Sequence, residues 1–179
     1  MELYYPSKVW KYCPYCGSKQ ISWGADTHMM LCNLCKKTFY INSSAAVVAL
    51  IKNENGELLF TRRKNNPAKG MLDLPGGFVD ICESAEDAMR REIKEELNII
   101  TNSVIFFASF PNRYLYDGIV YFTTDIVFYC QVNDFSTLKA ADDVSEYVFI
   151  STENIRIEDI GLDSIQAIIC KIKNTKGIV

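Results

Sequence analysis

The sequence predicts an α/β protein in which strands flank a central helix, with a small cysteine-rich module in front of them. Apolar runs of strand length, such as SSAAVVALI at residues 43–51, indicate buried strands. Amphipathic helices are predicted from about Ser84 to Leu97 and over roughly 163–173. The hydrophobic fraction of 49% and the charged fraction of 23% are typical of a globular protein.

Two Cys-x2-Cys pairs, CPYC and CNLC, define the N-terminal module, and fifteen residues separate them. This spacing offers four thiolates to one tetrahedral ion and leaves a β-hairpin between the pairs, which is typical of a zinc ribbon. A rubredoxin-like iron site is the alternative, whereas disulfides are disfavoured in a chain without a signal peptide. His28, the only histidine, is expected on the surface of the hairpin. The predicted zinc ligands are Cys13, Cys16, Cys32 and Cys35.

A boundary between two domains is predicted near residues 40–44. Residues 1–42 are too few to form a core and make the metal-stapled zinc ribbon, whereas residues 43–179 form the main domain. Within that domain, Asn53–Gly56 supplies a turn, and LLFTR at 58–62 is expected to be the hairpin partner of the first strand. Later strands are predicted at 104–110, 119–123, 125–132 and 146–150.

The first predicted helix carries three glutamates on one face. Glu92, Glu95 and Glu96 are spaced i, i+3, i+4, so their side chains converge on a helix. Carboxylates that repel one another are tolerated when they bind hard cations such as Mg²⁺ or Mn²⁺. A solvated acidic face is the alternative. Ser84 is the predicted N-cap, and Asn98 is predicted to end the helix in the left-handed conformation.

The glutamates belong to a longer pattern in residues Gly77–Ile99. Arg91 precedes them, and Glu83 lies eight residues before that arginine. The segment resembles the Nudix box, G-x5-E-x7-R-E-U-x-E-E-x-G-U with U an aliphatic residue, and departs from it at Asn98, where the family has glycine. The resemblance covers residues 45–170. It implies an α/β/α sandwich with a mixed sheet and the activity of a pyrophosphohydrolase.

The resemblance also implies roles for individual residues. The carbonyl of Gly76, in a predicted Gly-Gly turn, joins the glutamates in holding Mg²⁺ or Mn²⁺, while Arg91 pairs with Glu83 and orients the helix. Metal-activated water attacks a phosphorus of a diphosphate linkage, and one of the glutamates or a later carboxylate takes its proton. Asp142 and Asp143 are candidates for that later carboxylate, because ADDVSEYVFI resembles the family's D-E-x-x-E-x-x-W-V region. Asp143 is the predicted catalytic residue, with a surface loop acid as the alternative.

A zinc ribbon before a Nudix box is the layout of the NADH pyrophosphatase group. That group's S-Q-P-W-P-F-P-x-S element corresponds here to ASFPNRYLYDG, which keeps Ser109 and Pro111 but lacks the tryptophan. The predicted substrate is a nucleoside diphosphate derivative, such as NADH, NAD⁺, ADP-ribose or a similar dinucleotide, cleaved to AMP and a second phosphate product. The candidate substrate-binding residues, with core aromatics and a solvated basic cluster as the alternatives, are Arg63, Phe110, Tyr114 and Tyr116.

Composition limits the other classes of function. The net charge of −3 and the pI near 5.3 argue against a protein that binds duplex nucleic acid. The start MELYYPSKVWKYC lacks a signal-peptide core and no run approaches 18 apolar residues, so a cytoplasmic location without a membrane contact is expected. The alternatives are a nucleoside triphosphate pyrophosphatase and a nucleotide-sensing, RNA-binding or protein-binding module. The ribbon is expected to be a staple and dimerisation element, which is compatible with a homodimer.

Overall fold

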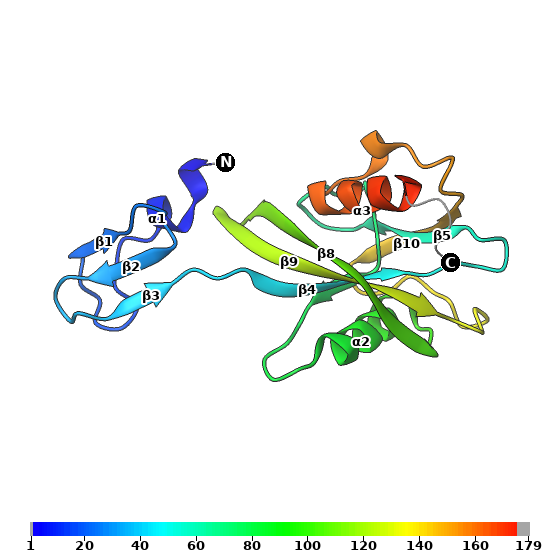
Figure 1. Ribbon diagram of the computed structural model, residues 1–179, viewed down its shortest axis with the longest axis horizontal. Coiled ribbons are helices and arrows are strands. Elements are labelled where there is room, and N and C mark those ends of the chain that lie inside the picture. Colours follow the sequence, from blue (N-terminus) through cyan, green and yellow to red (C-terminus); the bar gives the residue numbers. More distant parts are fainter. Residues whose placement is uncertain (1, 175–179) are drawn as a thin grey trace. The chain divides into compact units, whose positions relative to one another are not determined.

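A computed structural model describes residues 2–174 and divides them between two compact units (Figure 1). The N-terminal unit contains the residues up to Ser43 together with 113–122, and the main unit contains the rest. In the described part of the chain, no helix is both long and apolar enough to cross a membrane. The elements of the N-terminal unit are η1 (Glu2–Tyr4), α1 (Pro6–Val9), β1 (Ile21–Trp23), β2 (Met29–Cys32) and β3 (Thr38–Tyr40).

The main unit contains two sheets with the strand orders β7-β4-β9-β8 and β10-β5-β6. Strand β4 runs parallel to β9 and antiparallel to β7, so the larger sheet is mixed, as predicted. The elements that begin in this unit are β4 (Ser44–Leu50), β5 (Leu58–Arg63), β6 (Leu72–Asp73), β7 (Gly76–Phe78), α2 (Ala85–Leu97), β8 (Ser103–Tyr116), β9 (Ile119–Gln131), β10 (Val144–Ile150), η2 (Ile157–Asp159) and α3 (Asp163–Asn174).

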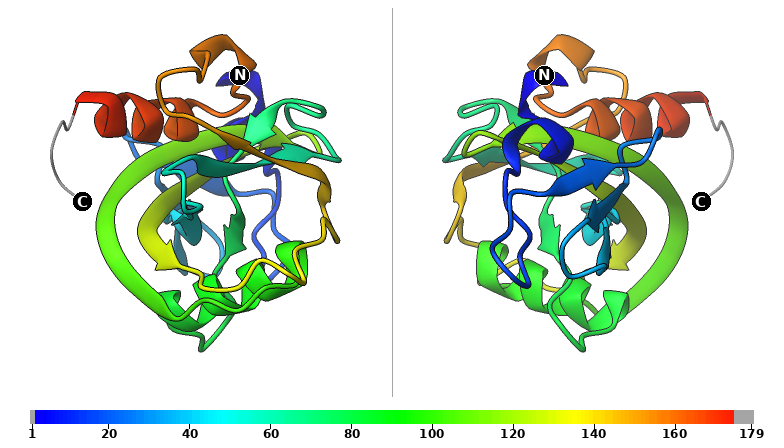
Figure 2. Two further views of the ribbon diagram at one scale, coloured as in Figure 1. Left: turned by 90° about the vertical axis from the view of Figure 1, so that its right-hand side faces the viewer. Right: turned by 90° about the vertical axis from the view of Figure 1, so that its left-hand side faces the viewer.

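Alternate side chains of β4 enter two different cores. Val47 and Ala49 pack in a cluster that includes Ile93 of α2, whereas Val48 packs in a cluster that includes Ile168 of α3. This division follows from the two-residue repeat of a strand, which sends successive side chains to opposite faces. Helices α2 and α3 accordingly cover opposite faces of the strands (Figures 1 and 2), and the predicted α/β/α sandwich is confirmed.

The predicted hairpin between the first two strands of the main unit is wrong beyond its turn. Lys52 and Leu58 form a bridge across the turn, and the N–H of Leu59 donates to the carbonyl of Ile51 (2.9 Å). Beyond that point β4 pairs with β7 and β9, while β5 pairs with β6 and β10. A continuous apolar run is buried on both faces, so its hydrophobic pattern does not specify which strand will be its neighbour.

The two strands predicted at 119–123 and 125–132 form one continuous strand, β9. Asp125 lies where the two predicted strands meet, and its buried carboxylate accepts a hydrogen bond from the hydroxyl of Thr123 (2.6 Å). Because this local bond satisfies the carboxylate, the strand continues through an acidic residue. Strand β9 joins β8 through Asp117 and Gly118, both with positive φ, as a two-residue hairpin turn requires.

Helix α2 begins and ends where the sequence predicted. The hydroxyl of Ser84 accepts a hydrogen bond from the N–H of Asp87 (3.1 Å), which satisfies a free donor of the first turn. Asn98 takes the left-handed conformation (φ 54°, ψ 28°), and its side chain donates to the carbonyl of Thr137 (3.1 Å). A glycine would adopt the same backbone conformation but would lack this contact, so asparagine compensates for the departure from the family pattern.

Candidate active site and metal sites

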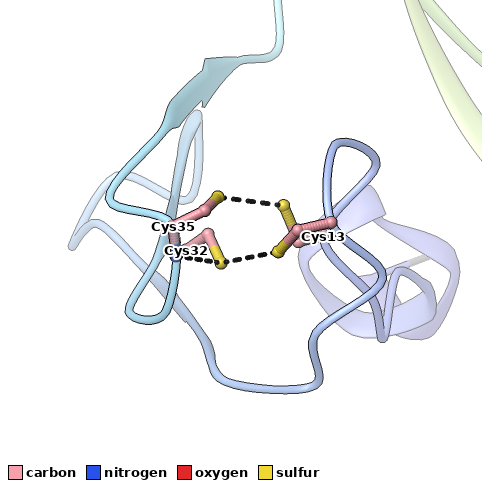
Figure 3. A group of neighbouring side chains, drawn as sticks. Cys13, Cys32 and Cys35 are labelled. Atoms are coloured by element: carbon pink, nitrogen blue, oxygen red, sulfur yellow. Dashed lines mark hydrogen bonds between the residues drawn. The ribbon is translucent and has the colours of Figure 1, made fainter.

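The four predicted zinc ligands converge in the N-terminal unit. All four Sγ atoms lie within 4.8 Å of one another. Cys13 and Cys35 are separated by 3.8 Å, and Cys16 and Cys32 by 3.6 Å (Figure 3). A tetrahedral ion with bonds of about 2.3 Å places its sulfur ligands about 3.8 Å apart. The thiols are unbridged, and their spacing fits one zinc ion.

Both cysteine pairs adopt the same turn. The N–H of Gly17 donates to the carbonyl of Cys13, and the N–H of Lys36 donates to the carbonyl of Cys32, each over 2.9 Å. Gly17 and Lys36 both have positive φ, which lets the chain reverse directly after each pair. The backbone N–H of Cys35 also donates to Cys32 Sγ (3.5 Å), and this bond lowers the pKa of Cys32 to about 6. The second turn therefore favours the thiolate form of Cys32, the form that zinc binds.

The rest of the ribbon differs from the prediction in one respect. The expected hairpin is formed by β1 and β2, and a third strand, β3, pairs with β2. The side chain of His28 is exposed, as predicted.

The second site lies where helix α2 approaches strand β7. The N–H of Gly76 donates to the carboxylate of Glu96 (2.9 Å). A Cβ atom at Gly77 would lie only 2.4 Å from the Glu92 carboxylate, and one at Gly76 would lie 2.0 Å from the carbonyl of Val47. The two glycines form a strand rather than the predicted turn. Gly77 lets the helix that carries the carboxylates pack directly onto the strand, and Gly76 lets that strand approach the backbone of β4.

Arg91 connects the acidic side chains of this site. Its guanidinium group donates to both carboxylate oxygens of Glu83, at 2.9 Å each. It also donates to Glu92 (2.8 Å) and Glu95 (3.1 Å) and to the carbonyl of Phe78 (3.0 Å). The hydrogen bonds from Arg91 lower the pKa of Glu83 to about 2. One cation thus fixes the loop after β7 against the first half of α2.

Glu96 is buried and the Glu92 side chain is only 12% exposed, and together they carry more negative charge than Arg91 neutralises. Burial raises the pKa of Glu96 well above its ordinary value, and the charges of Glu92, Asp73 and Asp142 raise it further. Burial is also the main cause of the raised pKa of Glu92. Glu95, by contrast, is half exposed. A divalent cation would relieve this repulsion, so the residues present fit the Mg²⁺ or Mn²⁺ that the sequence predicted.

The loop before β10 brings another carboxylate towards the glutamates. Its position is fixed where the N–H of Ala141 donates to the carbonyl of Glu96 (2.9 Å). The charge of Asp142 acts on both buried glutamates and raises their pKa. Asp143, the predicted catalytic residue, instead accepts a hydrogen bond from the side chain of Asn65 (2.7 Å). A catalytic role for Asp143 stays a prediction. The charge that acts on the glutamates is that of Asp142.

Asp73 is a site residue that the sequence analysis missed. Burial raises the pKa of this carboxyl group, although Arg63 donates to it at 2.5 Å. The Nε of Arg63 also donates to the carbonyl of Pro67 (2.6 Å), so this candidate substrate-binding residue is held by Pro67 and by its ion pair with Asp73. The available signal was an acid between Leu72 and Leu74, immediately before the Pro-Gly-Gly sequence.

The aromatic residues predicted to bind substrate fall into different units. Phe110 packs against the α3-side core of the main unit, with the ammonium group of Lys171 5.6 Å from its ring centroid. Tyr114 and Tyr116 belong to the tip of the β8–β9 hairpin, which is part of the N-terminal unit. Their ring centroids lie 6.1 and 6.3 Å from that of Tyr121. A role in substrate binding stays a prediction for all three.

Comparison with known proteins agrees with this geometry. Residues 42–168 match the model of the NUDIX domain, and the chain belongs to the Nudix family. It is 38% identical over 125 residues to an ADP-ribose pyrophosphatase of Methanocaldococcus jannaschii, an alignment that covers 69% of this chain and 70% of the relative. It is 30% identical over 103 residues to the NAD-capped RNA hydrolase NudC of Escherichia coli, covering 56% of this chain but only 38% of NudC.

Solved structures show the same fold. A Nudix hydrolase of Nitrosomonas europaea superposes with a TM-score of 0.69 and 20% identity, covering 93% of this chain and 92% of the other. A MutT protein of Methanosarcina mazei gives a TM-score of 0.59 and 25% identity, covering 77% of this chain and 99% of the other. The protein is therefore a Nudix pyrophosphohydrolase with a four-cysteine cluster near its N-terminus.

We expect one zinc ion per chain, retained on dialysis and bound by the four clustered cysteines. Cys13→Ser should lose the zinc and unfold the N-terminal unit, because metal binding supplies much of the folding free energy of such a module. Elemental analysis and circular dichroism measure both effects. Cys170→Ser, at an exposed cysteine of α3, is the matched control and should keep its zinc. Metal-free protein with an intact fold would contradict the assignment.

Glu96→Gln should stabilise the metal-free protein at pH 8. Because its pKa is raised on folding, Glu96 binds a proton more tightly in the folded than in the unfolded chain, so its ionisation lowers stability as pH rises above about 4.5. We expect the variant to gain about 1–3 kcal/mol in free energy of unfolding at pH 8 and less at pH 5, measured by urea denaturation. The exposed Glu86→Gln is the control. A gain independent of pH, or a loss, would contradict the burial of an ionised carboxylate.

Proposed function

We propose that this pyrophosphohydrolase cleaves the diphosphate linkage of a nucleoside diphosphate derivative, with ADP-ribose, NADH or a similar dinucleotide as substrate and AMP as one product. The observation that carries the proposal is the packing of Glu92 and Glu96 onto the glycine backbone of β7, with Arg91 paired to Glu92. The similarity to an ADP-ribose pyrophosphatase over two thirds of both chains supports this class of substrate.

The residues that would hold Mg²⁺ or Mn²⁺ are the three glutamates of α2 and the carbonyl of Gly76. Bound there, the ions would neutralise phosphate oxygens and lower the pKa of a water molecule. The chain itself holds the ligands in place. The N–H of Gly76 fixes Glu96, and Arg91 fixes Glu92 and Glu95 while Glu83 anchors the arginine. Such preorganisation avoids rearrangement of the carboxylates during the reaction.

The carboxylate that accepts the proton of the attacking water must have an oxygen that is free of other hydrogen bonds. Glu95 meets this condition because it is half exposed, and the loop before β10 offers Asp142 and Asp143 as alternatives. The influence of Asp142 on both buried glutamates supports Asp142, whereas the hydrogen bond from Asn65 supports a structural role for Asp143.

Two adjacent substitutions separate these roles. Asp142→Asn should lower kcat by about 10²–10⁴-fold if Asp142 is the general base, whereas Asp143→Asn should stay within tenfold of wild type. Asparagine tolerates the positive φ (49°) of Asp142, so the substitution removes the charge without disturbing the backbone. Glu95→Gln serves as the reference for loss of a metal ligand, with about a 10³-fold loss. The reverse order of the two aspartate variants would return the role to Asp143.

The substrate is tested by a panel of ADP-ribose, NADH, NAD⁺, diadenosine polyphosphates and nucleoside triphosphates, with Mg²⁺ or Mn²⁺ and products separated by chromatography. We expect AMP from ADP-containing diphosphates and no strong preference for the reduced nicotinamide. Tyr114→Ala should raise KM by about tenfold with little change in kcat if its ring stacks on the base. Release of pyrophosphate from nucleoside triphosphates as the main activity would favour the alternative function. Binding of these nucleotides without turnover would favour a sensor.

A further inference from the structure

Around its cysteine cluster, the N-terminal unit exposes an unusual number of tyrosine rings. The side chains of Tyr12, Tyr15 and Tyr40 are 55%, 68% and 66% exposed. Exposed aromatic rings that are grouped on one unit are candidates for a binding surface. Tyr12 adjoins Cys13, and Tyr15 lies inside the first cysteine pair, so the zinc site determines the position of both rings.

Lysine side chains lie over two of these rings. The ammonium group of Lys19 is 5.5 Å from the centroid of Tyr12, and that of Lys37 is 4.3 Å from the centroid of Tyr15. Lys37 follows the second cysteine pair, and its carbonyl accepts a hydrogen bond from the N–H of Cys32 (2.9 Å). We call these four residues, Tyr12, Tyr15, Lys19 and Lys37, the Tyr–Lys surface. It combines ring faces and cations on a backbone that the metal site holds rigid.

The N-terminal segment is positively charged, although the chain as a whole is negatively charged. The first 43 residues contain five lysines but only two acidic residues, Glu2 and Asp26, whereas the whole chain has a net charge of −3. Four thiolates on a Zn²⁺ ion would add two negative charges, fewer than the excess of positive charge. The five lysines are all exposed, whereas Cys16 is the one exposed member of the cysteine cluster, so the cations of this unit are open to a ligand.

We propose that the Tyr–Lys surface binds single-stranded RNA. Unpaired bases stack on aromatic rings without regard to sequence, and their phosphates bind lysines, so a ring beside an ammonium group matches one nucleotide. A duplex hides its base faces and would gain only the charge contacts. The tyrosine hydroxyls can bond to ribose 2′-hydroxyls, which favours RNA over DNA. This role is separate from diphosphate cleavage.

The test is fluorescence anisotropy with a 3′-labelled 12-nucleotide oligouridine bearing a 5′-hydroxyl, which contains no diphosphate. The full-length, zinc-loaded protein should bind with a Kd on the order of 1–100 μM. Tyr12→Ala and Tyr15→Ala should each weaken binding by about fivefold or more, whereas Tyr15→Phe should bind within twofold of wild type. Lys19→Gln and Lys37→Gln should each reduce the salt dependence of log K by about 0.7.

Matched controls come from exposed residues of the main unit, Tyr147→Ala and Lys52→Gln, which should leave RNA binding unchanged. Zinc content and dinucleotide turnover of each variant show that the fold is intact. If Tyr15→Ala loses zinc, the double variant Tyr12→Ala/Lys19→Gln, outside both cysteine pairs, decides the question.

Three results would overturn the proposal. The first is RNA binding that is absent or unaffected by the Tyr12 and Tyr15 variants. The second is equal or tighter binding of duplex RNA or of single-stranded DNA. The third is binding to phosphatidylserine vesicles in place of RNA. None of these results affects the proposed hydrolase activity, which the nucleotide panel tests independently.

Discussion

Electrostatic repulsion among the carboxylates of α2 is the constraint on which the active site depends. Five N–H donors in a rigid planar fork allow Arg91 to bond at once with Glu83, Glu92, Glu95 and the carbonyl of Phe78. A lysine in its place would offer a point charge and could not hold this geometry. The arginine offsets part of the repulsion and leaves the rest to be relieved by a cation. The site is thereby organised before any metal or substrate arrives.

The backbone contributes as much as the charged side chains. Gly77 lacks the Cβ atom that would otherwise collide with the Glu92 carboxylate, and Gly76 lacks the one that would collide with the backbone of β4, with which β7 pairs antiparallel. Because β4 is buried on both faces, between the α2 and α3 cores, its position is determined by two independent sets of apolar contacts. The position of the candidate active-site carboxylates therefore depends on β4, a strand that is packed on both of its faces.

The two units of the chain achieve stability by different means. The main unit buries apolar side chains in two clusters, whereas the N-terminal unit has few buried side chains and gathers four cysteines at one point. A module of this size relies on metal coordination in place of a core. Because this unit does not depend on burying its aromatic residues, it can expose Tyr12 and Tyr15.

Local patterns in the sequence determined helix α2, with its caps at Ser84 and Asn98, and the cysteine cluster, because spacing along the chain fixes both. Only the tertiary structure decided which strands pair and which distant acids approach the site. Asp142 acts on the glutamates because its loop is bonded to the end of α2, and the charge of Asp73, from β6 of the smaller sheet, raises the pKa of Glu96. No local spacing in the sequence predicts either effect, because both depend on the packing of segments that are far apart in the chain.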